Sequence, residues 1–114
     1  MKFKDYLNVD MITEMANVDD TYHDIRNIKM NVRQPGDKLY AHDISIKVFK
    51  GKNINDSMIV GINRNTNVLT IHRNTKHLTK KEQKNSMSFI QKNVLNFINL
   101  WDDPTLSLNE VQWA

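Results

Sequence analysis

The stretch "DISIKVFKGKNINDSMIVGINRNTNVLTIHR", residues 43–73, decides the fold class. Apolar side chains take every second position in three segments of it, at Ile44, Ile46 and Val48, at Met58, Val60 and Ile62, and at Leu69 and Ile71. A period of two is typical of strands that bury one face. The polar segments "GKNIND" and "RNTN" between them are typical of short turns. The sequence therefore predicts three consecutive antiparallel strands.

Upstream of this stretch, Ile28, Met30 and Val32 repeat the alternation, and "QPGDK" at 34–38 marks a turn. We therefore expect a fourth strand and a four-stranded antiparallel meander with one buried face. Phe49 on the other face is the one aromatic placed to stack on a base. The polar face is predicted to display Lys29, Arg33, Lys47, Asn63, Thr70 and His72.

Downstream, residues 78–101 predict one long helix. Thr79 and Glu82 form the capping-box pattern T-x-x-E at its start. An apolar stripe with helical spacing would lie across the sheet: Met87, Ile90, Val94, Phe97, Ile98 and Trp101. Phe89 and Leu100 fall outside this stripe. We expect them to meet the tail, with its Leu106, Leu108, Val111 and Trp113, or to join the tail in an oligomer contact.

The N-terminal spacing of Tyr6, Leu7, Met11, Ile12 and Met15 predicts one or two short amphipathic helices from residue 3 to about residue 18. Residues 17–24 then form a polar loop. The predicted fold is α+β and a single domain over 1–114: an N-terminal helix, the meander, the long C-terminal helix packed on one sheet face, and an extended tail. Its parts are an acidic helical segment (1–24), the sheet with the long helix (25–101) and an acidic tail (102–114).

Composition excludes several classes of protein. The 114 residues contain no cysteine, which excludes disulfides and thiolate metal sites. No apolar run reaches the ~18 residues of a membrane span, and the start lacks the apolar stretch of a signal peptide. The glycines stand alone, so the sequence has no glycine-rich nucleotide-binding motif. No serine lies in a G-x-S-x-G motif, so the sequence has no hydrolase signature of that type. We therefore predict a non-enzymatic cytoplasmic protein of a bacterial host, with no catalytic residue, metal, cofactor, small-molecule substrate or membrane contact.

The formal net charge of +3 conceals a strong division along the chain. Residues 25–92 hold fourteen Lys and Arg against four Asp and Glu, a balance of +10, whereas residues 1–24 carry −4 and residues 93–114 carry −3. Such asymmetry favours an anionic partner, and neutralisation of the basic middle by the acidic ends within the fold is the other explanation.

Between residues 64 and 84 only Glu82 offsets six basic side chains. A helix start there also offers free N–H groups to a phosphate, although a solvated first turn explains the lysines equally simply. We predict a nucleic-acid or partner-binding site made of Lys80, Lys81, Lys84, Lys76, Arg73, Arg64, Lys47 and His77. His72 and His77 lack the H-E-x-x-H spacing of a metal site. A metal-independent nuclease that uses His72 or His77 with Arg73 and Lys76 is an alternative, in which acid–base groups and a phosphate clamp would be present.

Short motifs resemble known families. "EMANV", "AHDISIKVF", "LTKKE" and "FIQKNVLNFINLWDD", within residues 14–113, resemble a family of small uncharacterised bacterial and phage domains, sometimes found beside toxin–antitoxin genes. That resemblance implies no catalytic residue. "TKKEQKN" is similar to the second-helix signature of double-stranded-RNA-binding domains, which implies phosphate contacts by Lys80, Lys81 and Lys84. "MKFKDYLNVDMITE" is similar to the capsid-targeting peptides of internal phage head proteins.

We therefore expect a small binding module, encoded by a phage or mobile element, that engages nucleic acid or a nucleic-acid-handling protein through a basic face. The alternatives are a phage inhibitor of a host defence protein, similar to anti-CRISPR proteins, a metal-independent nuclease toxin, and an internal phage head protein.

Overall fold

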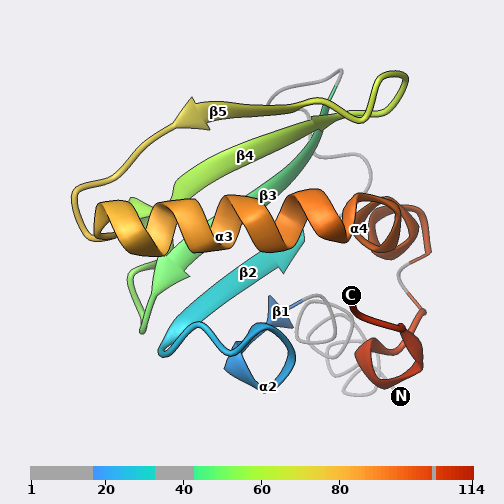
Figure 1. The fold of residues 1–114 in the computed structure, drawn as a ribbon, viewed down its shortest axis with the longest axis horizontal. Helices are drawn as coiled ribbons and strands as arrows, with labels where there is room; N and C mark the ends of the chain where they lie inside the picture. The colour runs from blue at the N-terminus through green and yellow to red at the C-terminus, as the bar shows by residue number, and fades with distance from the viewer. Residues whose placement is uncertain (1–16, 33–42, 104) are drawn as a thin grey trace, which may run out of the picture.

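The structure, a computed structural model, describes residues 17–32, 43–103 and 105–114. Its centre is a five-stranded antiparallel sheet whose strands lie side by side in the order of the chain (Figure 1). The strands are β1 (Asn17–Val18), β2 (Ile28–Val32), β3 (Asp43–Lys50), β4 (Met58–Asn63) and β5 (Leu69–Arg73). The predicted α+β class is confirmed, whereas the sheet has five strands and not the four predicted, because β1 pairs with β2.

Helices cover one face of this sheet. Figure 1 shows α3 (Lys80–Lys92) crossing the sheet, with α4 (Val94–Asp102) turned sharply away from its axis. A short helix, α2 (Asp20–His23), connects β1 to β2 along the chain. Two 3₁₀ turns complete the fold, η1 (Ile54–Asp56) and η2 (Leu108–Glu110). The sheet and these helices bring together residues from both ends of the described chain.

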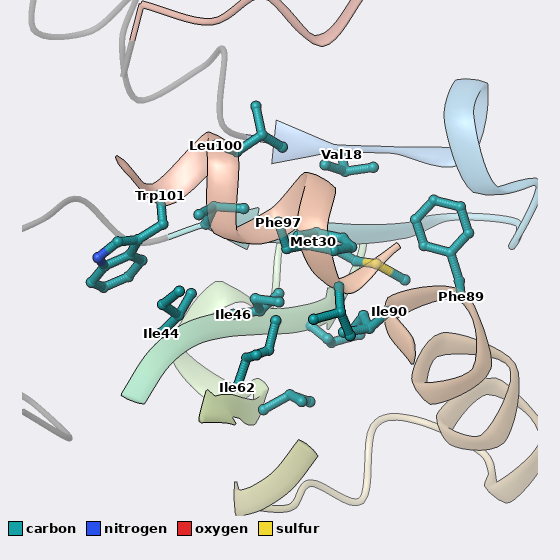
Figure 2. Close-up of a cluster of buried hydrophobic side chains, with 14 of the residues drawn as sticks. Val18, Met30, Ile44, Ile46, Ile62, Phe89, Ile90, Phe97, Leu100 and Trp101 are labelled. Carbon is teal, nitrogen blue, oxygen red and sulfur yellow. The ribbon is translucent and has the colours of Figure 1, made fainter. Parts of the chain in front are cut away.

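The core lies between the sheet and the two long helices. The alternating residues of β2 are buried as predicted, and the register sets Met30 opposite Val48 and Ile46 opposite Val60. Figure 2 shows the strand side chains facing those of α3 and α4, with Phe97 fully buried among them. Ile71 on the last strand is 42% exposed, so the core thins toward β5.

The region before β2 differs from the prediction. Residues 17 and 18 form a strand that pairs with β2, Val18 opposite Met30, and not the end of a helix. Residues 20–23 form a helix and not a loop, because the Asp19 side chain accepts a hydrogen bond from the Thr21 N–H and caps it. The N-terminal helix predicted from residue 3 otherwise falls on residues 1–16, which lie outside the described part.

The predicted long helix is broken at Asn93, which is 2% exposed and has a non-helical backbone. Its side-chain amide donates to the Phe89 carbonyl at 2.9 Å, and its oxygen accepts from Asn96 and from the N–H of Ala114. Asparagine competes in this way with helical backbone bonds. Beyond the break, Val94, Phe97 and Trp101 of the predicted stripe remain buried.

Phe89 and Leu100 are also buried, although both lie outside the single predicted stripe. Phe89 stacks on Trp113 of the tail at 5.4 Å between ring centroids, and Phe97 meets the same indole edge-on at 5.6 Å. The expected contact of Phe89 with the tail is thus present within one chain. The oligomer surface predicted on Phe89 and Leu100 is used internally.

The other face of the sheet is more buried than predicted. Phe49 is 5% and Ile59 is 1% exposed, and neither belongs to the core cluster under the helices. A ring buried to this extent offers no surface to a base, so the predicted stacking role of Phe49 is wrong.

Candidate functional site

The first turn of α3 is built by local hydrogen bonds that the sequence predicts. The Thr79 hydroxyl accepts from the Glu82 N–H at 3.0 Å, and the Glu82 carboxylate accepts from the Thr79 N–H at 2.8 Å, which confirms the capping box. Leu78, 4% exposed, anchors the approach in the core. The side chains of the first turn therefore project from a fixed support.

Two acidic side chains near this turn are already occupied. Glu82 forms an ion pair with Lys50 of β3 at 3.0 Å, and the Thr79 N–H and Lys50 lower the pKa of its carboxyl. Asp56 accepts from the Thr75 hydroxyl and contacts the His77 ring nitrogen, both at 2.8 Å. Glu82 therefore neutralises Lys50 and Asp56 contacts His77, and within the described residues neither carboxylate pairs with a lysine of the turn.

Four exposed lysines surround the start of α3, namely Lys76, Lys80, Lys81 and Lys84, and we call them the lysine cluster. Within the described part of the chain none of them forms an ion pair. The capping box uses the Glu82 N–H, so the N–H groups of Lys80 and Lys81 have no acceptor among the described residues. The turn thus combines positive side chains with two free backbone donors.

The other predicted site residues lie apart from the lysine cluster or are engaged elsewhere. Arg64 pairs with Asp102 at 2.7 Å, and Figure 1 shows that β4–β5 turn at the α4 end of the molecule, far from the start of α3. Arg73 donates to the Ser57 carbonyl and hydroxyl at 3.1 and 3.2 Å. Lys47 lies between two core residues of β3 and so projects from the opposite sheet face.

A groove beside α3 was not predicted. It has a volume of about 590 Å³ and runs between one side of α3 and the loop after α2. Its cationic side chains are Arg26, Lys81 and Lys92. The spacing of Lys81, Asn85, Ser88 and Lys92 would have placed these four on one helix side. No sequence pattern could have predicted Arg26 beside them, because only the tertiary structure places it there.

Metal-ligand groups and membrane-spanning helices are both absent from the described residues. Over 17–32, 43–103 and 105–114 there is no group of three or more side chains able to hold a metal ion. No helix in those ranges has the length and apolarity to cross a bilayer.

The geometry defines an α+β protein with a basic helix start and an adjoining groove. Comparison with known proteins gives no significant match to a family model, a curated protein or a solved structure. The family resemblances drawn from short motifs therefore stay predictions.

Proposed function

We propose that this chain is a non-enzymatic module that binds nucleic acid through the lysine cluster. The carrying observation is that four exposed lysines lack an acidic partner among the described residues, while Glu82 and Asp56 beside them are occupied. Phosphate groups attract lysine side chains and helix-terminal N–H groups without regard to base sequence. The surface is thus suited to positioning on a phosphate backbone.

The test is a triple variant, Lys80→Glu, Lys81→Glu and Lys84→Glu, in the full chain. Binding of an oligonucleotide should be lost, and the affinity of the parent should fall steeply with salt, with a log–log slope of about −0.9 per phosphate contact on duplex DNA. The fold should persist, since acidic residues suit the first helical turn better than lysines do. The melting temperature verifies this.

Lys29→Glu is the control, because Lys29 lies between core residues of β2 and so projects from the sheet face opposite α3. It should leave affinity nearly unchanged. If the triple variant is folded and binds as the parent does, the lysines are a solvated helix end and the proposal fails. If the parent captures an acidic protein but no oligonucleotide, the same charge serves a protein partner, as the inhibitor alternative requires.

A further inference from the structure

We propose that the bound nucleic acid is a single strand whose phosphate backbone lies in the groove beside α3. This inference rests on the proposed function and adds where the strand lies and which form of nucleic acid is preferred. It starts from the shape of the groove, which α3 walls on one side and the loop Asp24–Arg26 on the other.

The groove continues the lysine cluster along the helix. Lys81 belongs to both, and Lys92 lies eleven residues further, about 16 Å along the axis at ~1.5 Å per residue. Asn85 and Ser88 lie between them on the same side and offer neutral hydrogen-bond donors. This length accommodates several consecutive phosphates of one strand.

The charges of the groove favour an anion. Arg26, Lys81 and Lys92 form no ion pair with another described residue. The acidic side chains of the lining are Glu82, which Lys50 already neutralises, and Asp24; Ala114, the last residue of the sequence, also lines the groove. Asp24 is therefore the one acidic side chain of the lining without an ion pair among the described residues, and it should weaken binding.

The wall of the groove opposite α3, residues 24–26, is held in place by contacts within the chain. His23 Nδ1 accepts from the Ile25 N–H at 2.9 Å, and its ring packs edge-on against Phe89 at 5.6 Å between centroids. Asp24 has a left-handed backbone, with φ at 61°, which turns the chain toward the groove. A wall fixed before binding costs little ordering entropy when a strand enters.

Tyr22 adds an aromatic ring to the lining. Its hydroxyl donates to Asn109 at 2.9 Å, and its ring, half-buried, lies 5.9 Å from that of Trp113. Basic grooves with aromatic rings are typical of proteins that bind single strands, where bases stack on the rings.

A duplex would contact a different set of lysines. At ~100° per residue, Lys80 and Lys84 point about a quarter-turn away from the groove side of α3. A stiff duplex would rest on the helix side that carries Lys80 and Lys84, because it cannot bend into the groove. A flexible single strand can enter the groove. Substitutions on the two sides of α3 therefore separate the two modes of binding.

The experiment measures binding of an oligothymidine of about twelve nucleotides, and of its duplex with oligoadenosine, a length within the usual single-strand site size. The groove variant is Arg26→Glu with Lys92→Glu, and its matched control with the same charge change is Lys80→Glu with Lys84→Glu. We expect the groove variant to lose at least about tenfold in single-strand affinity, since two phosphate contacts are reversed, and the control to lose clearly less. Asp24→Asn should strengthen binding, because it removes a negative charge from the groove. The fold should persist, since asparagine also tolerates the left-handed backbone.

The outcomes separate the two proposals. Loss in the Lys80/Lys84 control with full binding by the groove variant, or preference for the duplex, overturns the groove while the lysine cluster retains its role. Failure of the folded parent to bind either probe overturns both. Equal melting temperatures of the two double variants show that the comparison concerns binding and not folding.

Discussion

The guanidinium of Arg64 donates two hydrogen bonds to the carboxylate of Asp102, at 2.7 and 2.9 Å, and thereby joins the β4–β5 turn to the end of α4. The same contact raises the pKa of Arg64 and lowers the pKa of Asp102. Arg64, which the charge pattern of the sequence assigned to a partner, thus pairs with a carboxylate of the same chain.

Arg64→Gln should therefore leave oligonucleotide affinity unchanged. Both side chains of the pair are about half exposed, so its loss should lower the free energy of unfolding by less than about 1 kcal/mol. Urea denaturation and a binding titration measure the two quantities. A large loss of affinity would return Arg64 to the binding surface.

Phe97→Ala should destabilise the protein by about 3–5 kcal/mol, because it removes a ring with 0% exposure from the centre of the core. Leu95→Ala on the same helix is the control: Leu95 is 66% exposed and its loss should change stability by about 0.5 kcal/mol or less. Equal melting temperatures for the two variants would contradict the described packing of α4.

Thr79→Ala should cost about 1 kcal/mol, since it removes the acceptor for the Glu82 N–H at the start of α3. Thr79→Ser keeps the hydroxyl and should lose much less. Thermal unfolding of the pair tests the cap, and identical losses would show that the methyl group and not the hydrogen bond matters.

Stability should depend on pH through His23, which is 8% exposed and whose Nε2 has no hydrogen-bond partner among the described residues. Burial lowers the pKa of His23 below 6.5, against the opposing effects of the Ile28 and Val18 backbone and of Asp20 and Asp19. The unfolded chain therefore takes up the proton first. The stabilisation that neutral His23 contributes is complete above pH 6.5. It is lost as the pH falls from 6.5 toward the lowered pKa of His23 in the folded protein.

His23→Asn isolates this effect, because its side-chain oxygen can accept the Ile25 N–H as Nδ1 does. The variant should be less stable overall but should lose the slope of unfolding free energy between pH 7 and the onset of carboxylate titration. Glu82, whose pKa is lowered from 4.5, acts only below that window. An unchanged slope in the variant would assign the pH dependence to other groups.

The strands and the cap of α3 follow from local sequence, because a period of two and a T-x-x-E pattern need no knowledge of the rest of the chain. β1 has two residues and no pattern of its own, and only its pairing with β2 makes it a strand. The break at Asn93 depends on partners as distant as Ala114. The lysine cluster was visible for the same local reason, whereas Arg26 reaches the groove only through tertiary structure.

The strand order of the sheet also bears on how the chain folds during synthesis. Because each strand pairs with the one made just before it, the sheet can assemble as the chain emerges, through contacts close in sequence. Its apolar face, however, remains uncovered until residues 80–102 are made. A nascent chain that stops before α3 exposes Ile46, Val60 and Ile62 to the cytosol of the cell that makes it, and such a fragment should require a chaperone to stay unaggregated.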